Sequence, residues 1–285
     1  MLTAKLEVHQ GWVTTISFSK AGNYLATGGR DHTLTLCPLT SQGDQFQGPF
    51  HRLEGHGGII SNVICSNDPA YFLSSSWDKT IRIWDTKERS IQRVFPLAHS
   101  DVILCVSLSS DDRVILTCSR DRTLKLWNTL GECKYTITEE HPIYDTKLIG
   151  DVIYYSHGTK LSRFNVKTSA RQLIYTGNDE ILYFAVPNSK MLFLVESKSV
   201  LVLVDLKSKE VMRKMKLDCA VCCMAPHPLK YYIAFGHDEG IVLLDVRNKT
   251  IIKTALIPGC LCLAWDKEGK FLFSGHKNGF IKIWK

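Results

Sequence analysis

The feature that most constrains this chain is a pattern of three residues that occurs twice with the same intervals. A histidine is followed 22 residues later by an aspartate, and six residues after that by a tryptophan. The two sets are His56, Asp78 and Trp84, and His99, Asp121 and Trp127. The two tryptophans are 43 residues apart. Matching intervals of this size predict a repeat architecture, in which each unit packs against its neighbours.

The first of these two units has a Gly-His start, an aspartate turn and a Trp-Asp end, and the second has Ala-His and Trp-Asn at the two ends. This pattern resembles the WD-repeat family, whose units are four-stranded blades of a β-propeller. The terminal tryptophan position can be followed through seven units, with Cys37 upstream and apolar residues at intervals of 37 to 40 residues downstream. Each unit ends in an alternating apolar segment, which is typical of a strand. These segments are Leu34–Cys37, Ile81–Trp84, Leu124–Trp127, Leu161–Phe164, Val200–Val204, Ile241–Leu244 and Phe280–Trp284. The sequence therefore predicts an all-β, seven-bladed WD-repeat β-propeller.

The two ends of the chain complement each other. The seventh unit stops at Lys285 without an outer strand, whereas the strand-like segment Thr3–Val8 precedes the first unit and has no partner there. We predict that this segment becomes the outer strand of the last blade and closes the ring, which protects the sheet edges. Residues 1–285 then form a single domain, with the longest loop at Thr40–Pro49.

The repeated residues suggest at first a Ser-His-Asp hydrolase set. However, the same four types occur twice, as His56, Ser76, Asp78 and Trp84, and as His99, Ser119, Asp121 and Trp127. An enzyme needs one active site, whereas a repeated fold needs one fastener in each unit. The resemblance to WD repeats implies a buried hydrogen-bonded chain from Trp to Ser to His to Asp that fixes the turn between strands two and three. We assign these residues a structural role and predict no catalytic residue. Because the set decays in later units, we expect packing to hold those blades together.

Basic residues flank the aspartate turns of the first three units. They are Arg30 and His32, then Lys79 beside Trp77, then Arg120 and Arg122. In a propeller these turns share one face, so the residues form a basic arc that suits phosphate contacts. The alternative is that they are solvated turn residues, or that Arg30 and Arg120 pair locally with acids.

Composition adds a weak indication of a polyanionic partner. The net charge is +7, with 45% hydrophobic and 22% charged residues, as in soluble globular proteins. Residues 1–140 hold 14 Lys and Arg against 15 Asp and Glu, so the surplus lies in residues 141–285. The densest basic run is Lys207 to Lys216, for which edge protection of a strand is the default explanation and a second phosphate contact the alternative. No apolar run reaches the length of a membrane span, and Met1–Gln10 lacks a signal-peptide core.

The ten cysteines form no disulfide-like framework, which favours a reducing, cytoplasmic compartment. Cys219, Cys222 and Cys223 with Cys260 and Cys262 invite a zinc hypothesis. We place both groups in inner strands of adjacent blades, where alternation points Cys219 and Cys222 to opposite faces. Buried core thiols are the better interpretation, and we predict no metal and no cofactor.

One passage resembles a more specific family. Residues 119–137, with Gly11–Ile16, Ser75–Asp78 and Leu261–Trp265, are similar to the receptor for activated protein kinase C, a G-protein beta-like propeller of the small ribosomal subunit. The resemblance implies a non-enzymatic scaffold that contacts ribosomal RNA and ribosomal proteins and recruits kinases and translation factors. In that family a basic pair in the blade-one turn anchors the protein to the ribosome. The matching positions are Arg30 and His32, where histidine in place of lysine makes one contact weaker or pH-dependent.

Two features depart from that family. Only Ala255–Gly259 links the sixth and seventh units, where the family has a longer protruding segment, and the fourth unit is short. A ribosome-associated role is therefore the safer implication, and kinase binding the less secure one. The alternatives are a general WD-repeat adaptor that is not bound to ribosomes, and a propeller enzyme, which would need unrepeated polar residues that we do not find. A G-protein beta subunit would need a helical N-terminal extension, which the early first strand disfavours.

Overall fold

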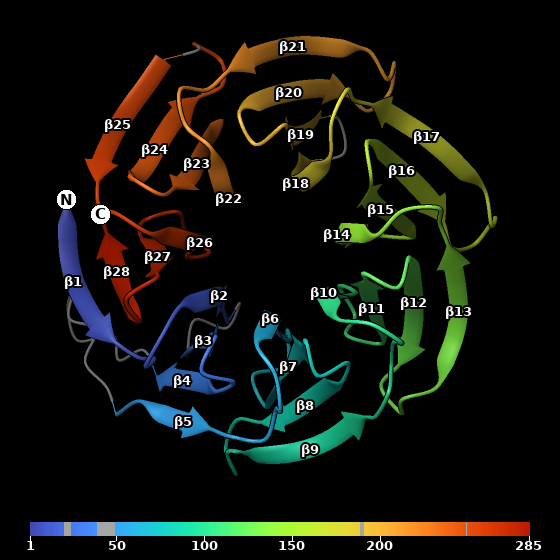
Figure 1. Ribbon diagram of the computed structural model, residues 1–285, viewed down its shortest axis with the longest axis vertical. Coiled ribbons are helices and arrows are strands. Elements are labelled where there is room, and N and C mark those ends of the chain that lie inside the picture. Colours follow the sequence, from blue (N-terminus) through green and yellow to red (C-terminus); the bar gives the residue numbers. More distant parts are fainter. Residues whose placement is uncertain (20–23, 39–48, 189–190, 249) are drawn as a thin grey trace. The chain divides into compact units, whose positions relative to one another are not determined.

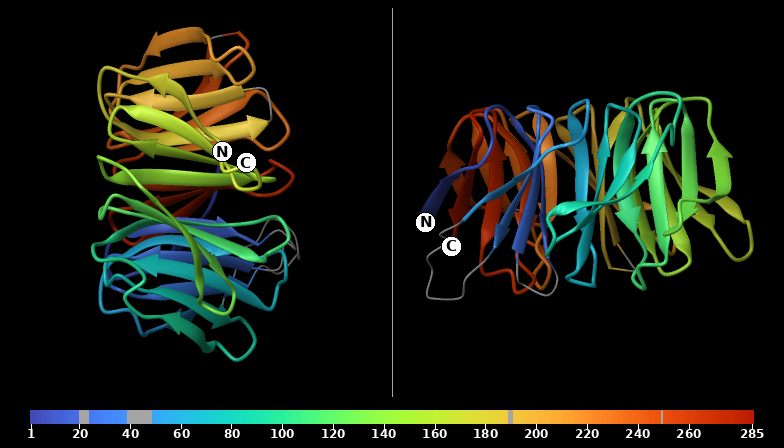
Figure 2. Two further views of the ribbon diagram at one scale, coloured as in Figure 1. Left: turned by 90° about the vertical axis from the view of Figure 1, so that its right-hand side faces the viewer. Right: turned by 90° about the horizontal axis from the view of Figure 1, so that it is seen from below.

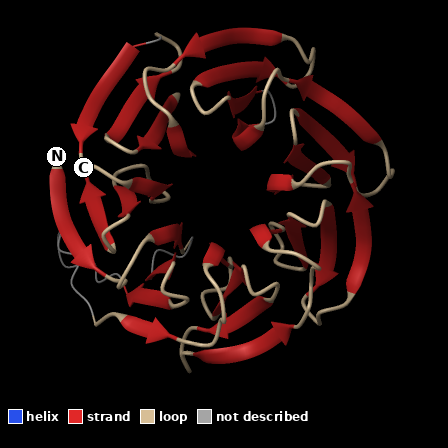
Figure 3. Cartoon of the chain, in the orientation of Figure 1, coloured by secondary structure: helices blue, strands red, loops and turns tan. Residues whose placement is uncertain are grey.

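The computed structural model describes residues 1–19, 24–38, 49–188, 191–248 and 250–285, and in these ranges every regular element is a β-strand (Figure 3). The strands form seven four-stranded sheets. The chain is thus a seven-bladed β-propeller, as predicted. The predicted loop Thr40–Pro49 lies outside the described residues except for Pro49. The chain divides into two compact units, residues 1–98 with 222–285 and residues 99–221, and each is described by itself. The prediction of a single domain stays a prediction.

The first unit contains four blades (Figure 1). Blade one comprises β2 (Val13–Phe18), β3 (Tyr24–Gly29), β4 (Leu34–Pro38) and β5 (His51–Leu53). Blade two comprises β6 (Ile60–Cys65), β7 (Tyr71–Ser76), β8 (Ile81–Asp85) and β9 (Ser90–Phe95). Blade six comprises β22 (Val221–Pro226), β23 (Tyr232–His237), β24 (Gly240–Asp245) and β25 (Thr250–Leu256). Blade seven comprises β26 (Cys260–Trp265), β27 (Leu272–His276), β28 (Phe280–Trp284) and β1 (Leu2–Glu7).

The second unit contains blades three to five. Blade three comprises β10 (Ile103–Leu108), β11 (Val114–Ser119), β12 (Thr123–Asn128) and β13 (Cys133–Thr138). Blade four comprises β14 (Ile143–Ile149), β15 (Val152–His157), β16 (Lys160–Asn165) and β17 (Arg171–Thr176). Blade five comprises β18 (Ile181–Asn188), β19 (Met191–Glu196), β20 (Val200–Asp205) and β21 (Val211–Lys216). All seven predicted third strands are therefore present, and blade one also has the short outer strand β5, which the sequence analysis missed.

The N-terminal strand closes the last blade as predicted. β1 pairs antiparallel with β28, with Leu6 opposite Ile281, and it lies beside the red C-terminal strands in Figure 2. Leu6 points into an apolar layer between blades seven and one, where it packs with Val13, Phe273 and Ile283. Leu2, in the same strand, is 42% exposed, because β1 buries one face while its start projects outward.

Apolar layers of this kind separate consecutive blades in each unit. One layer lies between blades one and two, and in the second unit similar layers lie between blades three and four and between blades four and five. The last layer is the largest of these and is built from branched aliphatic and aromatic residues such as Leu161, Phe184 and Leu194. This packing accompanies the loss of the His, Asp and Trp set in blades four and five.

We predict that Leu6→Ala lowers the free energy of unfolding by about 2 to 4 kcal/mol, because it leaves a cavity in the layer that closes the last blade. Leu2→Ala is the matched control and should change stability by less than about 0.5 kcal/mol. Equilibrium denaturation in urea measures both. Equal effects of the two substitutions would show that β1 does not carry the closure.

Candidate nucleic-acid interface

The aspartate turns of blades one to three share one hydrogen-bond pattern. In each, the aspartate carboxylate accepts from the Nδ1 of the histidine, at 3.1 Å for Asp31 and His9, 2.7 Å for Asp78 and His56, and 2.9 Å for Asp121 and His99. A threonine two residues after the aspartate donates its hydroxyl to the same carboxylate, at 2.8, 2.7 and 2.6 Å. The backbone N–H after each histidine donates as well, at 3.0 Å in all three blades. The carboxylate is thus fully bonded, and the turn is fixed.

The hydroxyl that continues each network is not the predicted one. His56 Nε2 contacts Ser74 Oγ at 2.7 Å, and Trp84 Nε1 donates to the same oxygen at 2.8 Å. In blade three the same place is taken by Thr117, bonded to His99 and Trp127. The expectation of Ser76 and Ser119 was therefore wrong. Residues i and i+2 of a strand share a face, so spacing alone could not separate the two positions.

Ser76 and Ser119 have a different role. The Oγ of each accepts the N–H of the aspartate two residues later, at 3.1 Å for Asp78 and 3.0 Å for Asp121. They lie at the ends of β7 and β11 and hold the start of the turn. Blade one has Gly29 at this position and Thr27 at the linking position, 2.9 Å from His9 Nε2.

Burial and pairing set the protonation of these groups. Burial raises the pKa of Asp78, but hydrogen bonds from His56 and Thr80 outweigh it and hold the pKa well below its ordinary value. Burial lowers the pKa of His56, although Asp78 partly opposes this. His56 is therefore neutral at pH 7 and donates from Nδ1 to an ionised carboxylate. This fixes the ring so that Nε2 faces Ser74.

The fixed turns present their flanking residues to solvent. Arg30, His32 and Trp77 in the first unit, and Arg120 and Arg122 in the second, are exposed, and Lys79 is half-buried. The residue after the aspartate has a positive φ in all three blades: 65° for His32, 69° for Lys79 and 68° for Arg122. Among the described residues, Lys79, Arg120 and Arg122 have no ion pair with an acid. The structure places the predicted basic residues of each unit at equivalent turns.

Arg30 has two neighbours that were not predicted from the sequence. The guanidinium of Arg30 lies over the ring of Trp12, 4.6 Å from its centroid, and the Nζ of Lys277 lies 5.7 Å from the same centroid. Trp12 is 39% exposed. Arg30 therefore contacts an aromatic face, where the sequence analysis weighed local pairing with an acid. The Gly-Trp pair at positions 11 and 12 was the available signal, because Arg and Lys side chains often lie over tryptophan rings.

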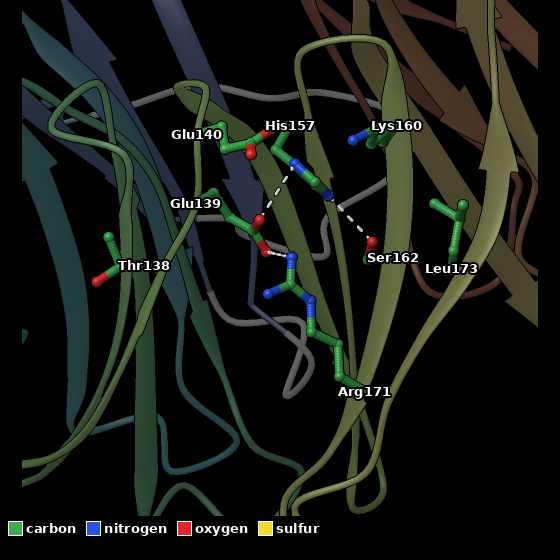
Figure 4. A pocket seen from close by; sticks show the side chains of 8 residues that line it. All are labelled: Thr138, Glu139, Glu140, His157, Lys160, Ser162, Arg171 and Leu173. Atoms are coloured by element: carbon green, nitrogen blue, oxygen red, sulfur yellow. Dashed lines mark hydrogen bonds and ion pairs between the residues drawn. The ribbon is translucent and has the colours of Figure 1, made fainter.

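Blade four has a rewired network around a pocket of about 510 Å³ (Figure 4). Glu139 takes the position that His56 and His99 have in their blades, and it accepts from Tyr155 at 2.8 Å and from Arg171. His157 ends β15, with Nδ1 3.5 Å from Glu139 and Nε2 3.0 Å from Ser162 Oγ. The carboxylate thus has the histidine position of the other blades, while the histidine lies at the strand-two end, where blades two and three have Ser76 and Ser119. The hydroxyl of Ser162 lies within strand β16, and other blades also have hydrogen-bonded polar residues at the end of strand two. We therefore assign Glu139, His157 and Ser162 a structural role.

The later blades also place a polar residue at the end of strand two. In blade five Glu196 accepts from Tyr175 at 3.0 Å and lies 3.4 Å from Lys214. In blade seven Trp284 donates to Ser274, which is 2.9 Å from His276. Lys214, a member of the run Lys207–Lys216, thus has an ion pair with an acid.

The cysteine groups form no metal site in the part of the chain that the structure describes. Cys223 and Cys260 are buried, with their sulfur atoms 3.9 Å apart. Cys219 is not in an inner strand as expected, because the chain bends at residues 218 and 219 before β22 begins. In the same described ranges, no helix is long and apolar enough to cross a membrane.

Comparison with known proteins agrees with this geometry. The model of the family described as WD domain, G-beta repeat matches residues 1–36, 47–85, 90–128 and 256–285. The small ribosomal subunit protein RACK1 of Neurospora crassa is 32% identical over all of this chain and 96% of its own length. The chain belongs to the RACK1-like WD-repeat family. MST50-interacting protein 11 of Pyricularia oryzae is 33% identical over all of this chain and 96% of its own length. Cross-pathway control WD-repeat protein 2 of Flammulina velutipes is 32% identical over 98% of the chain and 95% of its own length.

The matched ranges of this RACK1-like chain end at residue 128 and resume at 256. They include most of blades one and two, the first three strands of blade three, and the strands of blade seven. The unmatched residues 129–255 contain the rewired networks of blades four and five.

We expect Ser74→Ala to lower the free energy of unfolding by about 2 kcal/mol or more, because it leaves buried nitrogens of His56 and Trp84 without a partner. Ser76→Ala removes one acceptor for a turn N–H and should cost about 1 kcal/mol. Urea denaturation of the two variants compares the positions directly. A larger loss for Ser76→Ala would contradict the assignment of Ser74 as the link.

Burial, and to a smaller extent Lys282, lower the pKa of His276 to about 4. Because the pKa of His276 is lower in the folded state than in the unfolded state, its contribution to stability is complete above pH 6.5 and is lost as the pH falls from 6.5 towards 4. His276→Asn should be less stable at pH 7 but should lose roughly 2 kcal/mol less than wild type between pH 7 and 4.5. His32→Asn, at an exposed position, should keep the wild-type slope. Parallel slopes for all three proteins would refute the prediction.

Proposed function

We propose that this RACK1-like chain is a non-enzymatic, cytoplasmic scaffold that binds the small ribosomal subunit and contacts ribosomal RNA through the turns of blades one to three. Three relatives, from Neurospora crassa, Candida albicans and Schizosaccharomyces pombe, are named small ribosomal subunit proteins and are 30 to 32% identical over the whole chain. The observation that carries the proposal is the set of rigid turns whose flanking side chains are basic.

Each turn is suited to a phosphate contact. The aspartate at the centre of the turn accepts hydrogen bonds from histidine and threonine, so its negative charge faces the blade and not a ligand. The flanking Arg30, Lys79, Arg120 and Arg122 direct positive charge outward, and Arg30 is ordered by Trp12. Ordered cations lose less conformational entropy on binding than free ones. Such contacts position a protein on RNA without reading its sequence.

A scaffold also needs surfaces for other proteins. The relatives named MST50-interacting protein 11 and cross-pathway control WD-repeat protein 2 take their names from partners or pathways other than the ribosome. We propose that this chain likewise recruits translation factors and protein kinase C-like kinases while it is on the subunit, next to ribosomal proteins. A general WD-repeat adaptor that acts away from ribosomes is the alternative function, and the following experiment separates the two.

Sucrose-gradient sedimentation of cell extract tests the proposal. Wild type should sediment with the small subunit at low salt and be released as salt rises, because phosphate contacts depend on counterion release. Arg30→Asp/His32→Glu should remain at the top of the gradient. Lys87→Asp/Gln92→Glu makes the same change in charge at exposed positions in the β8–β9 hairpin, and this variant should sediment like wild type.

The folded state of each variant is checked by its denaturation midpoint. Wild type at the top of the gradient under all conditions would contradict a ribosomal role and favour the adaptor alternative. Equal loss of subunit binding in both double variants would show that overall charge, and not the blade-one turn, decides the interaction.

A further inference from the structure

We infer that Lys277, in the turn of blade seven, is an additional RNA phosphate contact, that Trp12 positions it beside Arg30, and that Asp238 competes for it. The inference rests on the proposed function, because it extends the same face of the first unit. Lys277 occupies the turn position that Arg30 has in blade one and Trp77 has in blade two, directly after the last residue of strand two. All residues involved belong to the first unit.

The blade-seven turn is fastened to the start of blade one by backbone hydrogen bonds. The N–H groups of Val8 and His9 both donate to the carbonyl of Gly279, at 3.1 and 3.2 Å. Gly279 has φ of 83°, and a Cβ there would lie 2.0 Å from the carbonyl oxygen of His9. A side chain at this position would therefore separate the two segments. The turn that carries Lys277 is held against the histidine of the blade-one network.

The same network fixes Arg30. His9 bonds Asp31, which adjoins Arg30, and the N–H of Arg30 donates to the carbonyl of Trp12 at 2.8 Å. The Trp12 ring then contacts both cations. From the two centroid distances, the guanidinium carbon and the ammonium nitrogen can be no more than about 10 Å apart. Two cations on a rigid support at this separation suit a polyanion with regularly spaced charges, which is the chemistry of an RNA backbone.

Asp238 of blade six holds Lys277 in the absence of a ligand. Its carboxylate is 2.6 Å from Lys277 Nζ, and the two side chains are 66% and 41% exposed. An exposed pair of this kind is weak and exchanges readily for a phosphate. Asp238 has the same turn position in blade six that Arg30 has in blade one and Lys277 has in blade seven. A negative charge at this position weakens RNA binding on the blade-six side. Removing the acid should therefore have the opposite effect to removing the lysine.

The test measures binding of the purified full chain to RNA extracted from small ribosomal subunits, at 50 and 200 mM KCl. Lys277→Gln should weaken binding about three- to tenfold at 50 mM KCl and reduce the slope of log affinity against log salt by about one. Asp238→Asn should tighten binding about two- to threefold. Lys267→Gln, an exposed lysine in the β26–β27 turn at the other end of the same strands, should match wild type.

Trp12 is tested as a positioning residue. Trp12→Leu should weaken binding as Lys277→Gln does, whereas Trp12→Phe, which keeps an aromatic face, should restore most of the affinity and the salt slope. Denaturation midpoints show that each variant is folded. A merely structural role for Trp12 would lower the midpoint without changing the salt slope, and this result would overturn the positioning role.

The outcomes separate this inference from the proposed function. If wild type joins the small subunit in gradients but does not bind the extracted RNA, the proposed association stands and the phosphate contact is refuted. If wild type binds RNA and Lys277→Gln binds equally well, or if Asp238→Asn weakens binding, the role of Lys277 is refuted. If wild type binds neither the subunit nor the RNA, both proposals fail.

Discussion

The hydrogen bond between a buried histidine and a turn aspartate is the interaction on which the motif-bearing blades depend. The aspartate brings a charge into a largely buried site, which would be costly without full bonding. His Nδ1, a threonine hydroxyl and backbone N–H groups supply that bonding in blades one to three. The histidine and the following N–H belong to the entry loop, the threonine belongs to the turn, and the histidine also bonds strand two, so these three segments are fixed together. The left-handed φ of His32, Lys79 and Arg122 follows from the same geometry and is tolerated only because the surrounding bonds determine it.

Blades four to seven show that the fold does not require this particular set. Blade four has Glu139 in the histidine position and His157 at the end of strand two, blade five places Glu196 at the end of strand two, and blade seven uses His276 with Ser274. In each case a polar group near the strand-two end receives partners from neighbouring strands. Extensive apolar packing between blades four and five accompanies the change. In blades four, five and seven a hydrogen-bonded polar group at the end of strand two is combined with apolar packing between sheets, and different residue combinations provide it.

The sequence was most informative where the physics is periodic. Alternation and constant spacing located the third strand of every blade, and an unpaired segment at each end indicated the pairing of β1 with β28. Prediction failed for Ser74 and Ser76, because both side chains lie on the same face of the strand and both positions satisfy the sequence pattern. Only the structure shows that His56 bonds Ser74, while Ser76 bonds the turn. It also failed for β5, which has three residues. The contacts of Trp12 with Lys277 join residues 265 positions apart, and no local pattern in the sequence encodes them. The network of blade four was not predicted for a related reason, because its carboxylate and its histidine lie at positions that hold other residue types in blades two and three.

The turns divide structure and recognition between adjacent residues. In each motif-bearing blade the aspartate faces inward and is held by the histidine, while the residue before it faces solvent. The buried member cannot vary without losing its partners, whereas the exposed member can change with little cost in stability. The exposed position therefore holds Arg30, Trp77, Arg120, Asp238 and Lys277 in different blades. A family with this fold can thus acquire different partners by changing one exposed residue in each turn, because the hydrogen bonds that stabilise the blade are made by the inward-facing residues. For the same reason, the positive charge of a basic turn is available for the binding role that we propose, because the hydrogen bonds of the blade do not depend on it.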